Sequence, residues 1–534
     1  MSDNKLISVF LHEGRHYTKD GLIELLEADE EKGVRILKRL KEYGILKTVK
    51  KEAADIDLTE LTEADYELSD VEDGNIKNLY VSFFVGVIMV EGKVLKCYPK
   101  YLPEYQKEEQ GPVKEMKQVL EVLKHFNRRE QIIHMQNQSE SESSFNLLAT
   151  MLYLLQEFLE YGLYTNTRDV IEINGSGEIL WDKTINETFT LISNNRPYYP
   201  EVLTKKRVNN DADFIRRLHA CVLTECSRLL KEAQLTELFQ LNSVELSDEL
   251  RADFGDDDYI LHRIMMELNV QYNTRKQLLL KTLYSYIANG GVQSHTEGFS
   301  MFGTNSFHVV WEKVCAEIFD NQLDISLDRI PFSVPVKYNK GETLKQLIEK
   351  PEWHENIEKI SHKAKDTLIP DIISIPEYKG GRYFVIFDAK YYNMILDKKM
   401  LKNQPGIESI TKQYLYQLAY REFLKDCKFD IENIRNCFLL PTAGETVINK
   451  GYVVLGMMHF FGLKQIEVRL LPAEEVFSCY LENKKYDICA LDLYECPNII
   501  NNSQQKELKC TNCSMPYDYE QVAESMRDYN VKKI

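Results

Sequence analysis

The sequence predicts an α+β protein of several domains, whose C-terminal part is an α/β domain built on a mixed sheet. Three observations predict this class. The chain of 534 residues is too long for one ordinary domain, so about two to four are expected. From about residue 299 onward, helical and strand periodicities alternate. Within that part, two apolar runs at 368–375 and 382–390 each carry one carboxylate and are separated by a turn signal.

The bulk composition narrows the class of protein. A formal net charge of −17 argues against binding nucleic acid through overall electrostatics, so any DNA contact requires a local basic strip or a partner. The N-terminus lacks the pattern of a signal peptide, and no apolar stretch is long enough to span a bilayer. Eleven cysteines without a secretion signal are typical of reduced thiols. We therefore expect a cytoplasmic protein without a membrane partner.

The N-terminal part begins with a winged-helix-like pattern over residues 1–50. Thr18 is a plausible N-cap for a short amphipathic helix, and a longer basic helix follows over 30–41 before a strand begins near Ile45. This order suits either DNA binding or protein docking. Residues 51–75 are strongly acidic and predict a linker.

A mixed strand and helix region is expected over 76–295. Its pattern predicts strands over 79–90 and 94–100, helices around 112–126 and 145–164, strand-like alternation over 168–195 and mostly helix over 211–288.

The last region, 296–534, has the alternation that defines the α/β domain. In chain order, the pattern predicts a helix over 306–320, a strand near 332–338, a helical insertion over 343–365, a hairpin, a helix over about 408–424, and strands near 436–440, 451–461 and 465–471.

The hairpin carries the residues with the clearest chemistry. If Lys379 and Gly380 form its loop, Asp371 stands opposite Asp388; a loop one residue later shifts the pairing by two and keeps the acids close. Asp388 and Lys390 have the same parity, so both side chains lie on one face of the sheet. Two carboxylates and an ammonium group at the end of an apolar strand suit Mg²⁺ beside a water molecule to be activated.

Two helices add further candidates. Glu312 lies on the flank of the buried stripe of its helix, where a carboxylate is costly unless it is paired or binds a metal. On the later helix Gln413, Tyr416, Gln417 and Tyr420 recur at i, i+3, i+4 and i+7 and share one face. Such a face can orient a catalytic lysine or contact a sugar-phosphate strand.

The order of these elements resembles the PD-(D/E)xK nuclease superfamily over residues 306–441. The strings FDAKY at 387–391 and YQLAY at 416–420, with VGVI at 85–88 and YPK at 98–100, look like the McrC nuclease subunit of McrBC-type systems. Across most of its length the chain is similar to LlaJI-family restriction endonucleases.

The resemblance implies a type II/IV-like restriction endodeoxyribonuclease that hydrolyses DNA phosphodiester bonds in anti-phage defence. Asp371, Asp388 and the main-chain carbonyl of Ala389 would hold Mg²⁺, for which Mn²⁺ can substitute. Lys390 would position the attacking water and help to deprotonate it, and Glu312 would bind metal or orient a ligand.

Supporting residues and partners follow from the same resemblance. Gln417 and Tyr420 would support Lys390 or contact the strand that is cut, and Gln413 could replace Gln417. The partners implied are double-stranded DNA, a cognate DNA methyltransferase and a separate McrB-like AAA+ subunit that uses GTP or ATP. The chain contains no Gly-x-x-x-x-Gly-Lys-Ser/Thr string of its own. We expect residues 1–295 to dock the AAA+ subunit.

Two other classes are weighed against the nuclease. A non-catalytic assembly or regulatory subunit with a degenerate nuclease fold would be expected to lose one of Asp371, Asp388 or Lys390, and all three are present. A winged-helix transcription regulator would explain residues 1–50 and leave the C-terminal residues unexplained.

Two metal-binding strings are discounted. Residues 12–16 match the zinc-protease string His-Glu-x-x-His, but Gly14 lies inside it and the next helix begins after it. Cys510 and Cys513 have the spacing of half a zinc site. Cys489 and Cys496 could complete it but are too far from each other for a standard zinc knuckle, so reduced thiols are expected for all four.

Overall fold

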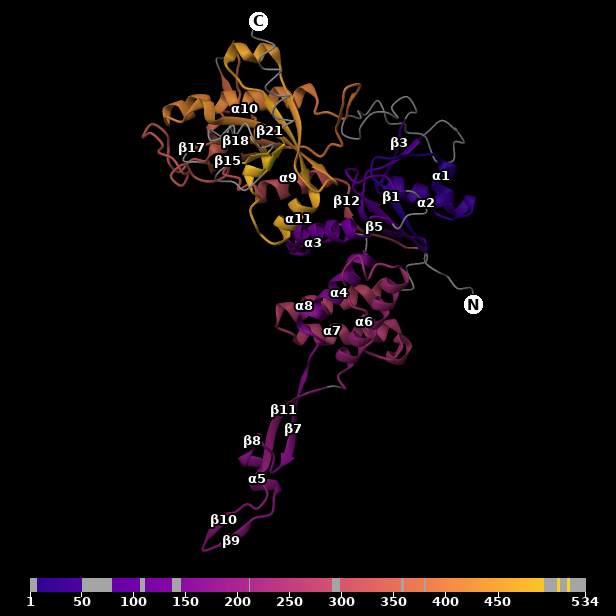
Figure 1. Ribbon diagram of the computed structural model, residues 1–534. Coiled ribbons are helices and arrows are strands. Elements are labelled where there is room, and N and C mark those ends of the chain that lie inside the picture. The colour runs from indigo at the N-terminus through magenta and orange to yellow at the C-terminus, as the bar shows by residue number, and fades with distance from the viewer. Residues whose placement is uncertain are drawn as a thin grey trace. The chain divides into compact units, whose positions relative to one another are not determined.

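The computed structural model divides into two compact units, Met1–Val310 and Trp311–Ile534. Each unit is described by itself (Figure 1). The acidic segment 51–75 and Cys496, Cys510 and Cys513 lie outside the described residues. The structure describes residues 7–49, 79–105, 111–136, 146–210, 212–290, 298–356, 360–378, 381–493, 507–509 and 516–518.

The first unit contains the predicted order of helix, helix and strand. These elements are α1 (Lys19–Leu25), α2 (Glu30–Glu42) and β3 (Leu46–Val49). The Thr18 side chain accepts a hydrogen bond from Gly21 N at 3.1 Å, which confirms it as the N-cap of α1. β3 pairs with β4 (Leu79–Ser82), so the sheet of this module includes a strand that follows the acidic segment.

A four-stranded sheet in the order β1-β6-β5-β12 shares a core with α1 and α2. Residues 299–304 belong to this first unit, because β12 pairs with β5. Gly86 is required at that pairing: its φ is +144°, and a Cβ there would lie 2.2 Å from Phe302 O. The strands are β1 (Ile7–His12), β5 (Val85–Val90), β6 (Lys93–Tyr98) and β12 (Phe299–Thr304).

The string at 12–16 forms no helix. His12 ends β1 and His16 begins β2 (His16–Tyr17), so a turn separates the two histidines. His12 Nε2 lies 3.1 Å from the carbonyl oxygen of Leu102, a structural contact. This geometry removes the arrangement that a zinc protease of this type needs.

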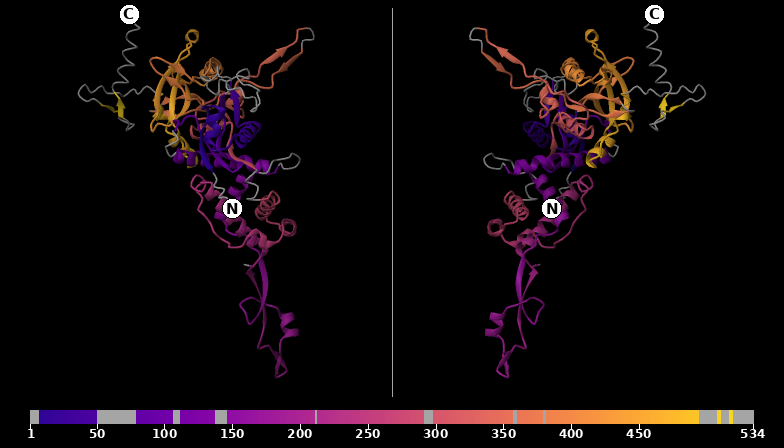
Figure 2. Two further views of the ribbon diagram at one scale, coloured as in Figure 1. Left: turned by 90° about the vertical axis from the view of Figure 1, so that its right-hand side faces the viewer. Right: turned by 90° about the vertical axis from the view of Figure 1, so that its left-hand side faces the viewer.

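Helices make up most of the remaining first unit, as predicted. They are α3 (Val113–Gln136), α4 (Leu147–Tyr161), α6 (Phe214–Glu232), α7 (Asp257–Val270) and α8 (Thr274–Ala288). Between α4 and α6 the chain forms a long β-ribbon, which we call the arm (residues 167–209). It is visible as the elongated purple segment in all three views (Figures 1 and 2).

The arm is built on the antiparallel pair β7 (Thr167–Ile173) and β11 (Leu203–Asn209), followed outward by a small hairpin of β9 (Leu191–Ser193) and β10 (Arg196–Tyr198). The strand-like prediction for 168–195 is wrong over α5 (Trp181–Glu187). Thr184 fixes this turn of helix, because its hydroxyl accepts a hydrogen bond from Leu203 N at 3.0 Å.

The second unit contains a five-stranded mixed sheet in the order β15-β18-β21-β23-β22, which confirms the predicted α/β arrangement. The two inner pairings are parallel and the two outer pairings are antiparallel. The strands are β15 (Ile372–Ser374), β18 (Phe384–Ala389), β21 (Ile434–Thr442), β22 (Ile448–Val453) and β23 (Ile466–Pro472).

Two helices lie on opposite faces of this sheet. Tyr416 and Tyr420 of α10 (Ile407–Asp426) pack in one core with Ile386. Phe387 points to the other face, where its ring lies 5.1 Å from that of Phe319, just after α9 (Phe307–Ile318). Successive strand residues alternate between faces, so the end of β18 lies between the two helices.

Three predictions for this unit are corrected. Residues 332–338 form no strand, because Pro331 and Pro335 lack amide donors. The predicted helical insertion at 343–365 is a 3-10 turn followed by a hairpin of β13 (Glu352–His354) and β14 (Ser361–Lys363). The strand expected over 451–461 stops at Val453, and Gly456–Phe461 is a 3-10 helix.

None of the helices in the described part of the chain combines the length and the apolar character needed to cross a bilayer.

Candidate active site

The pairing of β15 with β18 sets the positions of the two acids. Ile372 pairs with Phe387 and Ser374 with Val385, and continuing this register by one residue sets Asp371 opposite Asp388. This is the first of the two registers that the sequence left open. The loop residues 379 and 380 lie outside the described residues.

Asp371, Asp388 and Lys390 come together at the end of β18. Lys390 Nζ lies 3.1 Å from Asp388 Oδ2 and 3.9 Å from Asp371 Oδ2. The Ala389 amide donates a hydrogen bond to Asp371 Oδ2 at 3.2 Å. Asp388 is only 4% exposed, whereas the side chains of Asp371 and Lys390 are partly exposed. The predicted group therefore has one buried acid and two side chains that solvent can reach.

The electrostatics of this group favour a bound cation. Burial, and next the charge of Asp371, raise the pKa of Asp388. Burial lowers the pKa of Lys390, but Asp388 and Asp371 outweigh it, and the net shift of the lysine is upward. Because the two carboxylates repel each other when both are ionised, a divalent cation bound between them would relieve this repulsion.

Glu312 lies close enough to Asp371 and Lys390 for their charges to shift its pKa. Burial, followed by the charge of Asp371, raises the pKa of Glu312 to about 7. Yet no three His, Cys, Asp or Glu side chains among the described residues form a group that could hold a metal ion. The structure thus brings Asp371 and Asp388 together and places Glu312 beside them, outside a three-ligand cluster.

The donor set of the two acids nevertheless fits a hard cation. Asp388 Oδ2 is buried, and the Lys390 ammonium lies 3.1 Å from it as an ion-pair partner. An ionised carboxylate offers about four lone-pair sites, so this ion pair leaves the Asp388 carboxylate able to bind a ligand. Two carboxylates, joined by a main-chain carbonyl and water, are the oxygen ligands that Mg²⁺ prefers.

A buried amide layer lies on the α10 face of the sheet. Gln417 Oε1 accepts a hydrogen bond from Asn436 Nδ2 at 3.0 Å, and Asn436 pairs with Ile386, two residues before Asp388. Gln413 is fully buried, and neither polar atom of its side-chain amide has a hydrogen-bond partner among the described residues. Asn436 was missed by the sequence analysis; an amide in the otherwise apolar run around it was the available signal.

The two tyrosines of α10 have different places. Tyr420 is fully buried, its hydroxyl donates to Leu344 O at 2.9 Å, and its ring packs on Phe384. These are core contacts, and the role of Tyr420 at Lys390 or the DNA strand, which the resemblance implies, stays a prediction. Tyr416 is the tyrosine that reaches the site: its hydroxyl donates to Ile369 O at 2.9 Å, two residues before Asp371.

Trp311 ties α9 to the lysine-bearing strand end. Its indole Nε1 donates to Leu439 O at 3.1 Å, and the Lys390 amide donates to the same oxygen at 2.9 Å. Because Glu312 is the next residue, this shared acceptor fixes the distance between Glu312 and the end of β18.

The structure does not test whether the four C-terminal cysteines bind zinc. Cys489 lies in a 3-10 helix, Ile488–Leu491, and its possible partners are outside the described residues.

Comparison with known proteins defines the class of this chain as restriction endonuclease. The LlaJI restriction endonuclease family matches residues 84–474, which include every candidate site residue. The chain belongs to the LlaJI restriction endonuclease family. It is 30% identical to the type II restriction enzyme BsuMI component YdjA of Bacillus subtilis (strain 168) over 348 residues, 65% of this chain and 68% of the relative.

Two solved structures are also similar. A chain in an assembly of Thermococcus gammatolerans McrB AAA+ hexamers with bound McrC aligns with a TM-score of 0.33 and 13% identity, covering 89% of this chain and 99% of that chain. A chain of the Thermococcus gammatolerans McrBC complex aligns with a TM-score of 0.24 and 10% identity, covering 57% of this chain and 85% of that chain.

Proposed function

We propose that the chain is a Mg²⁺-dependent DNA endonuclease with a PD-(D/E)xK-type site. The observation that carries the proposal is the convergence of Lys390 with Asp388 and Asp371, at 3.1 and 3.9 Å, in a member of a restriction endonuclease family. Asp371, Asp388 and the carbonyl of Ala389 would hold the ion, which supplies charge neutralisation at the phosphate and an acidified water.

The side chains then divide the remaining work. Lys390 has a raised pKa and is protonated in this arrangement, so its first role is to donate hydrogen bonds that orient the attacking water and stabilise charge on the phosphate. Glu312, with a pKa near 7, would orient a ligand from the α9 side. Tyr416 and the Gln417–Asn436 pair hold the strand ends from the α10 side.

The direct test is cleavage of supercoiled plasmid in Mg²⁺ by the purified chain. The chain would be tested alone and with the AAA+ protein encoded beside it, plus GTP or ATP. Cleavage that disappears with EDTA supports the proposal. Absence of cleavage on both methylated and unmethylated DNA would favour the non-catalytic subunit.

Mn²⁺ or Mg²⁺ should raise the thermal midpoint of the protein, because the ion binds a carboxylate pair that exists only in the folded state. At an ion concentration of about 100 times Kd the expected stabilisation is roughly 2.7 kcal/mol. Asp388→Asn should remove this ion-dependent shift, whereas Asp324→Asn, at an exposed acid, should keep it. Differential scanning fluorimetry measures both; an equal shift in Asp388→Asn would contradict the metal assignment.

We further propose that a separate AAA+ NTPase activates the nuclease and docks on the first unit. The chain lacks a P-loop of its own, and its arm exposes large apolar side chains: Phe189 is 73% and Ile192 77% exposed. Exposed apolar clusters of this kind mark protein interaction sites. A cognate DNA methyltransferase and a cytoplasmic location stay predictions.

Replacing Phe189 and Ile192 together by serine should weaken binding of the AAA+ subunit by about 30-fold or more, the effect of a lost interface anchor. Neither side chain is buried, so the fold should be unaffected. Val336→Ser, at a 94% exposed valine of the second unit, is the matched control. Gel filtration of the mixtures measures the binding. A fragment that begins after β12, residues 305–534, and still joins the complex would contradict docking through the first unit.

A further inference from the structure

Asn321 makes three hydrogen bonds to main-chain groups from the turn that follows α9. Its Nδ2 donates to Asp371 O at 3.0 Å, and its Oδ1 accepts from Ile373 N and from Leu323 N, each at 3.0 Å. The Gln322 amide adds a bond to Ile373 O at 2.7 Å. Residues 321 and 322 therefore hydrogen-bond to the start of β15 in the way that a neighbouring strand would.

This contact matters because Asp371 lies one residue outside the paired part of β15, where the register with β18 begins at Ile372. β15 is only three residues long and lies at the edge of the sheet, and Asp371 precedes it. The Tyr416 hydroxyl holds Ile369 O on one side, and Asn321 holds the carbonyl of Asp371 itself and the amide of Ile373 on the other. With both sides fixed, the carboxylate stays on the Ala389 amide and near Lys390.

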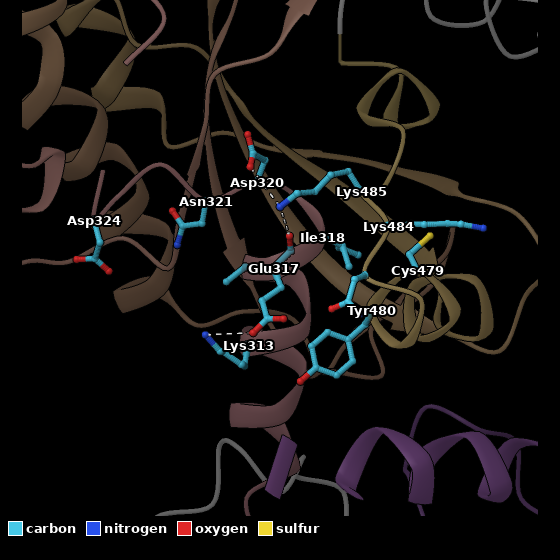
Figure 3. Close-up of a pocket in the computed structure, with 12 residues that line it drawn as sticks. Lys313, Glu317, Ile318, Asp320, Asn321, Asp324, Cys479, Tyr480, Lys484 and Lys485 are labelled. Atoms are coloured by element: carbon cyan, nitrogen blue, oxygen red, sulfur yellow. Dashed lines mark hydrogen bonds and ion pairs between the residues drawn. The ribbon is translucent and has the colours of Figure 1, made fainter. Parts of the chain in front are cut away.

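Asn321 is itself held by the C-terminal end of α9, because its main-chain amide donates to Ala316 O at 3.2 Å. That end of α9 is held in turn, because the Tyr486 main-chain amide donates to Ile318 O at 3.0 Å. Lys485 Nζ donates to Glu317 O at 2.8 Å and lies 3.2 Å from Asp320 Oδ1. Figure 3 shows Asn321 among the residues that line one pocket together with Glu317, Asp320 and Lys485. The position of α9 is thus transmitted to Asp371 through one carboxamide.

We propose that Asn321 is a positioning residue that sets the metal-binding geometry of Asp371. The proposal rests on the nuclease function proposed above. An amide is needed because the same side chain donates to one main-chain group and accepts from two others. Aspartate has the same shape and keeps the two accepted bonds, but it would place an oxygen against Asp371 O and lose the donated bond.

The test compares Asn321→Ala and Asn321→Asp with Asn339→Ala in the full chain. Asn339 also accepts a hydrogen bond from a main-chain amide, that of Gly341 at 3.2 Å, but it lies in an exposed turn. Both Asn321 variants should raise the Mn²⁺ concentration for half-maximal cleavage by about 10–100-fold, the usual cost of losing a group that orients a metal ligand. Asn339→Ala should match the wild type.

Hydrogen exchange read by NMR or mass spectrometry gives a second measurement that needs no activity. The Ala389 amide, which bonds the Asp371 carboxylate, should exchange faster in Asn321→Ala, while the central strands β21 and β23 keep their protection. Unchanged exchange at Ala389, or a uniform increase over the whole unit, would overturn the proposal. If the wild type neither binds Mn²⁺ nor cuts DNA, the nuclease function fails, and the exchange result alone still decides whether Asn321 positions Asp371.

Discussion

Lys390→Ala should reduce DNA cleavage by about a thousandfold or more, because it removes both the group that orients the attacking water and a positive charge at the phosphate. The ammonium lies 3.1 Å from Asp388 Oδ2 and 3.9 Å from Asp371 Oδ2, beside the carboxylates that would hold the metal ion. Plasmid cleavage under saturating Mg²⁺ with the AAA+ partner measures the loss.

The control for this variant is Lys412→Ala, which removes an exposed lysine paired with Glu408 on α10 and should cut normally. Lys390→Ala also leaves two carboxylates without their counter-charge, so its thermal midpoint must be recorded. A folded Lys390→Ala protein that cuts within tenfold of the wild type would contradict the assigned role.

Asp388→Asn should abolish cleavage and at the same time stabilise the metal-free protein above neutral pH. Burial and Asp371 raise the pKa of Asp388 above its ordinary value, so the folded state binds a proton there more tightly than the unfolded state. The contribution of Asp388 to the free energy of unfolding is fully present when the pH is below the pKa of Asp388 in the unfolded chain. It is lost as the pH rises through the pKa of Asp388 in the folded protein. Asparagine has no charge to bury and avoids this loss.

The gain in thermal midpoint of Asp388→Asn over the wild type should therefore be larger at pH 8 than at pH 5. Thermal melts in EDTA over this pH range test it, with Asp324→Asn as the exposed control. A variant that is less stable by the same amount at every pH would show that Asp388 acts as an ordinary structural partner of Lys390.

The central hairpin could be predicted from the sequence because strand parity and turn signals depend only on residues close together in the chain. Strand parity put Asp388 and Lys390 on one face, and the turn signal limited the register to two choices, of which the structure has the one that sets Asp371 opposite Asp388. The buried stripe of α9 likewise marked Glu312 as an acid that needs a partner, and burial and the charge of Asp371 raise its pKa in the structure.

The features that the sequence did not predict depend on contacts between residues far apart in the chain, which periodicity does not show. Helical spacing put Tyr416 and Tyr420 on one face of α10, but the choice between them is made by Leu344, 76 residues away, which accepts the Tyr420 hydroxyl. Asn321 was invisible for the same reason, since its partners Asp371 and Ile373 lie about fifty residues along the chain. The hairpin at 352–363 replaced a predicted helix where Pro351 interrupts the pattern.

The most direct measurement is linearisation of supercoiled plasmid by the purified chain with its AAA+ partner, comparing wild type, Asp371→Asn and Lys390→Ala in Mg²⁺ and in EDTA. We expect cleavage by the wild type in Mg²⁺ alone and none by either variant. Metal-dependent cleavage that persists in both folded variants would place the active site elsewhere, and no cleavage under any condition would make the chain a non-catalytic subunit.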